Sequence, residues 1–203
     1  MKITVIGIGE MGSAIATALT TRTKHAVFLK GSRPKSPSVI KLCKELGVKE
    51  ANEDELLTSE LVIAAVPAEA IEEVSKDLQK YTNTLLSVVS YLDYLKEDDG
   101  SPVSAAEKFL ELIPTAHVVH AFTSVSAQIM RELSTTTSSV FVCGDNEMAC
   151  NRVMELATEL GFTPLKAGGL VNARYAEAAG HLWASLAFDG GYGVRVHFEV
   201  HVK

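Results

Sequence analysis

The chain has 203 residues, of which 47% are hydrophobic and 22% charged, a composition typical of one globular domain and not of disordered or collagen-like protein. A chain of this length buries roughly 70% of the surface that it exposes when unfolded, so it needs neither a disulfide nor a metal to hold a core. The net charge of −6 argues against nucleic acid as a partner, because such binding depends on a basic surface, and we expect a small-molecule partner instead.

Short apolar runs alternate with segments of helical periodicity along almost the whole chain, a pattern typical of an α/β fold with a parallel sheet. We expect about eight strands, at 2–6, 26–30, 61–66, 85–89, 117–122, 140–143, 163–166 and 194–203. We expect helices at 11–20, 38–46, 54–57, 68–78, 103–112, 126–133, 147–160 and 172–186. The nearly continuous apolar runs 61–66 and 85–89 predict strands that are covered by helices on both faces.

Two later segments have distinct patterns. The charged stretch 95–102 ends in Asp-Gly-Ser-Pro, whose turn-forming residues predict a loop. From 194 to 203, valine and phenylalanine alternate strictly with charged residues and histidines, which predicts a strand with one solvated face. The polar residues of that face include two histidines and a glutamate, but we expect no metal site there or elsewhere.

The cysteines and the lack of long apolar runs predict a cytoplasmic protein. Cys43, Cys143 and Cys150 are odd in number and form no Cys-x-x-Cys pair, which is typical of buried thiols in a reducing compartment. No apolar run approaches the roughly 18 residues of a membrane span, so we expect no membrane partner. Glycines and Glu10 interrupt the apolar N-terminal stretch before a signal-peptide core could form.

A glycine motif at the end of the first expected strand predicts dinucleotide binding. Residues 7–12, Gly-Ile-Gly-Glu-Met-Gly, match G-x-G-x-x-G and lie between a strand and a helix, as the motif requires. The first glycine permits a tight turn, the second lets the backbone approach a pyrophosphate, and the third lets helix and strand pack closely. The alternative is that the glycines merely make a turn. The residues expected at the pyrophosphate are Gly7, Ile8, Gly9, Glu10, Met11 and Gly12, with the Glu10 side chain pointing away.

The end of the second expected strand selects the dinucleotide, because NAD enzymes place a carboxylate about 20 residues after the glycine motif. Segment 30–35, Lys-Gly-Ser-Arg-Pro-Lys, has no carboxylate but has a guanidinium, a hydroxyl and two lysines. Ser32, Arg33 and Lys35 are therefore expected at the 2′-phosphate of NADP, and a solvated basic turn is the alternative. We expect residues 1–167 to form an NADP-binding Rossmann-type domain with a doubly wound, mostly parallel sheet. Residues 168–203 are expected to form a small C-terminal helix-and-strand extension packing on it.

Further segments resemble a known family. They are Val88-Val89-Ser90 with Leu92, Ser104 to Glu107, Val118 to Phe122, Val142 to Asp145, and Ala167-Gly168 with Leu170, Asn172 and Arg174. In order and spacing they resemble the NADP oxidoreductases dependent on coenzyme F420, over nearly the whole chain. They are also similar to the cytosolic oxidoreductase domains of the STEAP metalloreductases, which have a comparable Val-Phe-Val-Cys-Gly segment, here 140–144.

The resemblance implies an enzyme, an NADPH-dependent oxidoreductase that transfers hydride between NADP(H) and coenzyme F420 or a flavin-type acceptor. It implies that Ala65, Val66, Pro67, Ser90 and Ala121 lie along the ribose and nicotinamide. Tyr91, His120, Phe122 and Thr123 are expected to face the acceptor, and packing in the core is the alternative for Tyr91, His120 and Phe122. Three positions depart from the family: Ile8 replaces a frequent Thr, Tyr91 a Pro, and Thr123 a His or Asn. Because hydride transfer is intrinsic to the two ring systems, we expect no catalytic acid or base.

Other functions remain open on the sequence. The segment 9–16 also resembles pyrroline-5-carboxylate reductases, which reduce an imine, although that family has a larger helical domain after its nucleotide fold. A STEAP-like flavin or ferric reductase module and a non-catalytic NADPH-binding sensor are further alternatives. The sequence identifies neither the acceptor nor the oligomeric state, and a homodimer is compatible with it.

Overall fold

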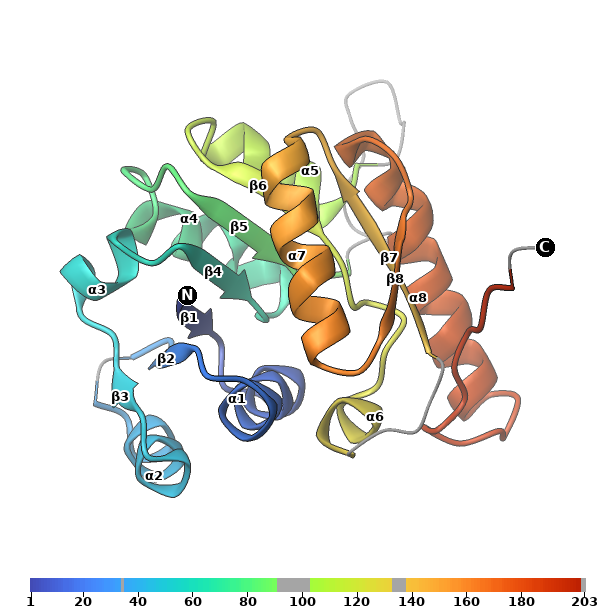
Figure 1. Ribbon diagram of the computed structural model, residues 1–203, viewed down its shortest axis with the longest axis horizontal. Coiled ribbons are helices and arrows are strands. Elements are labelled where there is room, and N and C mark those ends of the chain that lie inside the picture. The colour runs from blue at the N-terminus through green and yellow to red at the C-terminus, as the bar shows by residue number, and fades with distance from the viewer. Residues whose placement is uncertain (34, 91–102, 133–137, 202–203) are drawn as a thin grey trace.

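The computed structural model describes residues 1–33, 35–90, 103–132 and 138–201. The expected α/β fold of Rossmann type is confirmed: the strands of these residues form one sheet in the order β3-β2-β1-β4-β5-β6-β7-β8 (Figure 1). The expected loop at 95–102 and Tyr91 lie outside the described residues.

Six strands, β3 through β6 in that order, run parallel to one another, whereas β7 is antiparallel to β6 and β8 is parallel to β7. The strands are β1 (Lys2–Ile6), β2 (Ala26–Lys30), β3 (Lys49–Glu50), β4 (Leu61–Ala64), β5 (Thr84–Ser87), β6 (His117–His120), β7 (Ser139–Gly144) and β8 (Thr163–Lys166). The α-helices are α1 (Glu10–Arg22), α2 (Pro37–Leu46), α3 (Glu53–Leu57), α4 (Ile71–Asp77), α5 (Ala105–Leu112), α6 (Ala127–Arg131), α7 (Glu147–Glu159) and α8 (Ala173–Phe188). Two 3₁₀ helices are η1 (Ala68–Ala70) and η2 (Leu170–Asn172).

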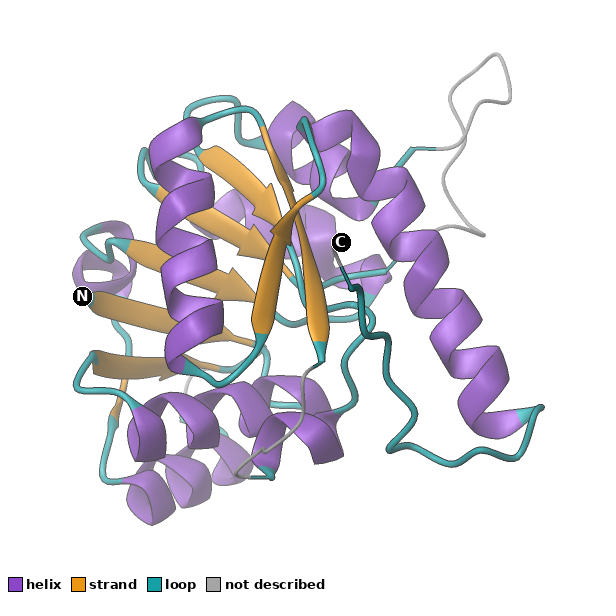
Figure 2. Cartoon of the chain, turned by 45° about the vertical axis from the view of Figure 1, so that its right-hand side comes forward, coloured by secondary structure: helices purple, strands orange, loops and turns teal. Residues whose placement is uncertain are grey.

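Helices cover both faces of the sheet (Figure 2). Successive residues of a strand point to opposite faces, so Ile63 joins the core under α1, α6 and α7, whereas Val62 joins the core under α3, α4, α5 and α8. Both of these central β4 side chains are at most 1% exposed. The strands are thus buried on both sides, as their continuous apolar sequences predict. None of the described helices is long and apolar enough to cross a membrane.

The order of the strands reverses between β1 and β4. From β1 the chain proceeds outward to β2 and β3, and it then returns to the other side of β1 to build β4, β5 and β6. In open α/β sheets, ligands bind at the carboxyl ends of the strands where the order reverses in this way. The fold therefore places a binding site beyond Ile6 and Ala64, where β1 and β4 end.

The expected strand at 194–203 is wrong for the residues described, because 194–201 adopt no regular secondary structure. The segment is held by separate bonds: the Ser139 amide donates to the Phe198 carbonyl over 2.8 Å, and the indole nitrogen of Trp183 donates to the Val196 carbonyl over 2.7 Å. The Val200 amide donates to the Ser139 hydroxyl over 2.9 Å, so both bonds of the segment to β7 are at Ser139. Bonds at one residue do not make the ladder that defines a strand.

Candidate functional site

The glycine loop is built from glycines of two kinds. Gly7 has a left-handed backbone with φ of 89°, and a Cβ there would lie 2.2 Å from the Ala65 carbonyl oxygen. A Cβ on Gly12 would lie 1.9 Å from the Gly7 carbonyl oxygen, so these two glycines are required for the fold itself. A Cβ on Gly9 would meet no atom within 4 Å. The space beside the Gly9 backbone is therefore open, and because glycine has no side chain a ligand can approach the backbone there.

Helix α1 begins directly after this loop, with Gly9 as its N-cap and no side-chain cap bond. The first amides of a helix have no partner within the helix and carry a partial positive charge. Such an end is a ready anion site, and the open backbone at Gly9 gives an anion access to it. The geometry therefore suits a pyrophosphate.

A cavity of about 350 Å³ lies beside the loop, at the reversal of strand order. It contains seven of the residues expected to bind the cofactor: Gly7, Ile8, Gly9, Ser32, Ala65, Val66 and Pro67. Glu73 and Asp77 of the lining were not expected from the sequence; they come from α4, together with Val74 and with Ala70, which directly precedes α4. These four residues have the i, i+3, i+4, i+7 spacing of one helix face, which was the available signal. We call this space the first cavity.

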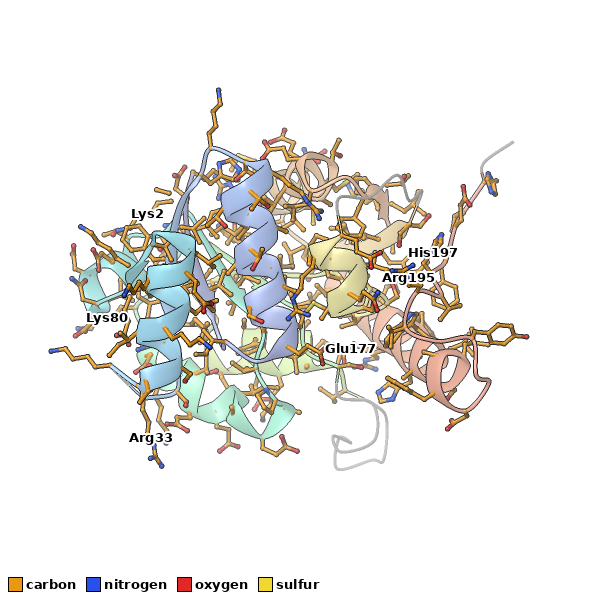
Figure 3. All side chains as sticks on the ribbon, turned by 90° about the horizontal axis from the view of Figure 1, so that it is seen from below. Lys2, Arg33, Lys80, Glu177, Arg195 and His197 are labelled. Carbon is orange, nitrogen blue, oxygen red and sulfur yellow. The ribbon has the colours of Figure 1, made fainter. Side chains whose placement is uncertain are left out.

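The basic loop lies at the rim of the first cavity. Ser32 lines it, whereas Arg33 and Lys35 are exposed, and Arg33 extends outward from the loop before α2 (Figure 3). Lys35 has a left-handed φ of 56°, and its amide donates to the Glu50 carboxylate over 3.1 Å. The Lys30 ammonium lies 3.2 Å from Asp77 and is held inside the cavity wall. The rim of the first cavity thus has the Arg33 guanidinium and the hydroxyls of Ser32 and Ser38 available to a ligand.

A second cavity, of about 310 Å³, lies on the other side of the glycine loop. Its lining comes from the start of α1, the β6–α6 loop, the start of α6, α8 and the C-terminal segment: Glu10, Met11, Thr123, Val125, Ser126, Ala127, Gln128, Trp183, Phe188 and Val194. Residues 7–9 line the first cavity and residues 10–11 line the second. A dinucleotide lying across this loop can therefore reach from one cavity to the other.

His120, at the end of β6, is completely buried behind the second cavity. Its Nε2 lies 3.0 Å from the Thr123 hydroxyl, and its Nδ1 lies 3.6 Å from Oε1 of Glu177, which is also completely buried. Burial lowers the pKa of His120 to about 3, so the ring is neutral at neutral pH. Sequence reasoning named His120 and Thr123 but missed Glu177, which lies far along the chain on α8.

The remaining expected site residues lie outside the linings of both cavities. Phe122 packs edge-on against Phe162, with ring centroids 5.6 Å apart, and is 2% exposed. Ala121 is buried at the end of β6. The Ser90 hydroxyl donates to the backbone carbonyl of Glu177 over 3.4 Å. Phe122 and Ser90 thus secure the frame of the site in this structure.

An ion pair ties α8 to α5 beside Glu177. Arg174 donates to both carboxylate oxygens of Glu107, over 2.8 and 2.7 Å. Desolvation raises the pKa of Glu107, but the bonds from Arg174 and Ser104 outweigh it and lower the pKa below its usual value. Helix α8 is thereby held at a fixed position over the second cavity.

Comparison with known sequences finds an oxidoreductase family and relatives that are a reductase and a dehydrogenase. Residues 2–93 match the family described as NADP oxidoreductase, coenzyme F420-dependent, which confirms the resemblance for this part of the chain. Metalloreductase STEAP3 of Rattus norvegicus is 29% identical over 178 residues, which are 87% of this chain and 36% of that protein. A glycerol-3-phosphate dehydrogenase (NAD(P)+) of Chlorobium phaeobacteroides is 24% identical over 174 residues, 79% of this chain and 51% of that protein. The chain thus spans about a third to a half of these relatives.

Solved structures confirm the fold. A protein of Arthrobacter sp. FB24, described as a candidate F420-dependent NADP reductase, superimposes with a TM-score of 0.79 at 24% identity, covering 100% of both chains. The 1-pyrroline-5-carboxylate reductase of Streptococcus pyogenes gives a TM-score of 0.61 at 19% identity, covering 82% of this chain and 57% of that one. The shared architecture thus extends over the strands and helices that bound both cavities.

Proposed function

We propose that this chain is an NADPH-dependent oxidoreductase that transfers hydride between NADP(H) and a deazaflavin, such as coenzyme F420, or a flavin. The observation that carries the proposal is the glycine loop, with its open Gly9 and uncapped α1, between two cavities at the reversal of strand order. The match of residues 2–93 to NADP oxidoreductases supports it.

The residues of the first cavity fit the adenosine half of NADP. The loop at Gly9 and the start of α1 would hold the pyrophosphate, because both present backbone amides without a competing side chain. Ser32 and Arg33 would hold the 2′-phosphate, which NAD lacks. The Glu50 carboxylate accepts from the Lys35 backbone amide, and Asp77 pairs with the Lys30 ammonium.

The second cavity suits a flat ring. Met11, Trp183, Phe188 and Val194 give it apolar walls, and Thr123 supplies a hydroxyl. When bound, NADPH supplies a hydride from C4 of its nicotinamide. The chain's contribution is to hold two rings within about 3–3.5 Å of each other and to exclude water, for which apolar walls are suited.

Anaerobic incubation with NADPH and, separately, coenzyme F420, FAD, FMN or pyrroline-5-carboxylate tests the proposal, by following the loss of nicotinamide absorbance. We expect oxidation of NADPH by the deazaflavin or a flavin and none by the imine. Gly9→Val is the matched control, because it fits the fold but obstructs the pyrophosphate.

Each other outcome favours a different function. Reduction of pyrroline-5-carboxylate would favour an imine reductase. Tight binding of NADPH with no transfer to any of the four acceptors would favour a non-catalytic sensor. Transfer only in the presence of ferric iron would favour a STEAP-like reductase module.

A further inference from the structure

Three polar side chains lie one behind another from the second cavity into the core. Thr123 lines the cavity, His120 lies behind Thr123, and Glu177 lies behind His120. Oγ1 of Thr123 lies 3.0 Å from Nε2, a hydrogen-bond distance. Nδ1 lies 3.6 Å from Oε1 of Glu177 and has no hydrogen-bond partner among the described residues, so a proton passes between them only when the two groups approach more closely. Both inner side chains have no exposed surface. Thr123 is thus the point at which this line meets the cavity.

Two arrangements of hydrogen atoms are available to this line. In one, the Thr123 hydroxyl donates to Nε2 of His120, and Nδ1–H points at Glu177. In the other, Nε2–H donates to Oγ1, and the hydroxyl turns to the carbonyl of Ala176, which lies 3.2 Å away. Nδ1 then presents a lone pair to Glu177, so a hydrogen on Oε1 is favoured. The two arrangements differ by one proton and by the tautomer of His120.

The fold holds Thr123 in this position at a cost in backbone strain. Phe122 has a left-handed φ of 68°, which is a genuine outlier for a bulky residue. From the other side, α8 approaches so closely that a Cβ on Gly180 would lie 2.9 Å from the Thr123 carbonyl oxygen. Strained backbone of this kind gathers at functional sites, where the surrounding structure maintains it.

Glu177 connects the start of α5 to His120. Its carboxylate oxygens accept from the amides of Ala105 and Ala106, over 3.2 and 3.4 Å. These residues open α5, whose N-terminal amides and dipole stabilise an anion. The Glu177 carboxylate therefore lies at a helix N-terminus.

We infer that Glu177, His120 and Thr123 form a proton relay that serves the acceptor in the second cavity. This inference rests on the proposed function, since it assigns the proton that accompanies the hydride. In the overall reaction, NADPH, the acceptor and one proton give NADP+ and the reduced acceptor. The hydride carries both electrons, and the relay carries the proton alone.

The proton would move along the relay in three transfers. In the direction that reduces the acceptor, Thr123 gives its hydroxyl proton to the acceptor, Nε2 of His120 reprotonates Oγ1, and Oε1 of Glu177 reprotonates Nδ1. Glu177 ends as the carboxylate, and the reverse direction returns the proton to it. His120 is neutral before and after, which agrees with the lowering of its pKa by burial. Thr123 would touch the acceptor, whereas His120 and Glu177 would act through it.

The kinetic test is single-turnover hydride transfer to coenzyme F420 or FMN, in H2O and in D2O, with matched variants. We expect Thr123→Val and Glu177→Gln to slow transfer by roughly a hundredfold and to lose the solvent isotope effect of the wild type. Thr123→Ser should restore both, because it returns the hydroxyl. NADPH affinity and the unfolding temperature are the controls for folding.

The second readout needs no acceptor. In protein labelled with 15N-histidine, the ring nitrogens of His120, assigned by comparison with His120→Gln, should report a neutral ring at neutral pH. Glu177→Gln should shift the ring toward the Nε2–H tautomer, since the amide group of glutamine donates to Nδ1. A protonated ring, or an unchanged tautomer in Glu177→Gln, would contradict the relay.

The outcomes separate the relay from the proposed function. If wild-type protein transfers hydride and Thr123→Val is as fast, the relay is wrong and the function stands. If Thr123→Ser is as slow as Thr123→Val, the role of Thr123 is structural and the relay is again wrong. If the wild type oxidises no NADPH with either acceptor, the proposed function fails, and the relay fails with it.

Discussion

The two cavities are built in different ways. The first is formed largely by backbone and short segments at the ends of neighbouring strands, with the glycine loop as its centre. The second draws side chains from segments far apart in sequence, from Met11 to Thr123 and Val194. The difference indicates that nucleotide binding is encoded by a local motif, whereas the acceptor site depends on how distant elements pack.

The largest effects of substitution are expected in the glycine loop, where one glycine is needed for stability and another for NADPH binding. Gly12→Ala should lower the free energy of unfolding by about 3 kcal/mol or more, because its Cβ would overlap the Gly7 carbonyl. Gly9→Val should leave stability nearly unchanged and abolish NADPH binding. Urea unfolding and calorimetric titration measure the two quantities. Normal NADPH binding by Gly9→Val would remove the loop from the site.

The next effect concerns the choice of nucleotide at the rim of the first cavity. Arg33→Ala should weaken NADPH binding by about 1.5–3 kcal/mol, a factor of roughly 10–150, and leave NADH binding nearly unchanged. Lys41→Ala, which removes an exposed positive charge from α2, is the matched control. Equal loss of both nucleotides in Arg33→Ala, by calorimetric titration, would make Arg33 structural.

A smaller effect is expected where α8 is attached over the second cavity. Glu107→Gln should lower the free energy of unfolding by about 1.5 kcal/mol, because it weakens the two bonds to Arg174. The pKa of Glu107 is lowered in the folded state, so its charge stabilises the fold fully above pH 4.5, the usual value. The difference between wild type and variant should therefore shrink as the pH falls below 4.5. A difference independent of pH would contradict this assignment.

The smallest effect is the quenching of tryptophan fluorescence, which reports whether a ligand lies in the second cavity. Trp183 is the single tryptophan of the chain and lines the second cavity. FMN or coenzyme F420 should quench its fluorescence, whereas 2′,5′-ADP, which represents the adenosine half of NADP, should bind without quenching. Free N-acetyltryptophanamide controls for absorption of light by the ligands. Equal quenching by 2′,5′-ADP would mean that the second cavity is not separate from the nucleotide site.

Local patterns predicted the strands and the glycine loop because each depends on neighbouring residues. The two-residue strand β3 was missed, since Lys49–Glu50 has no apolar pattern and is set by its pairing with β2. The segment 194–201 was mispredicted because alternation alone does not make a strand, and its described bonds to β7 are both at Ser139. Glu177 reads as an ordinary helix residue until α8 is packed on β6.

The prediction of the acceptor residues depended on the family resemblance more than on the hydrophobic pattern of the strands. Thr123 lines the second cavity, whereas the nominated Phe122 turns into the core and packs on Phe162. The reason is the left-handed backbone at Phe122, which alternation along a strand does not anticipate. Tyr91 lies outside the described residues, so its place at the acceptor stays a prediction.

The two cavities are expected to have separate roles, the first in binding NADPH and the second in binding the acceptor, and a pair of variants measured together tests this most directly. NADPH affinity and kcat/KM for the acceptor at saturating NADPH are compared for wild type, Arg33→Ala and Thr123→Val. We predict that Arg33→Ala changes only the affinity. Thr123→Val should lower only kcat/KM, by roughly a hundredfold if Thr123 delivers the proton, and by the loss of one hydrogen bond, about 0.5–1.5 kcal/mol, if it only orients the acceptor. If both variants change only the NADPH affinity, the acceptor does not lie at Thr123, and the division of roles is wrong.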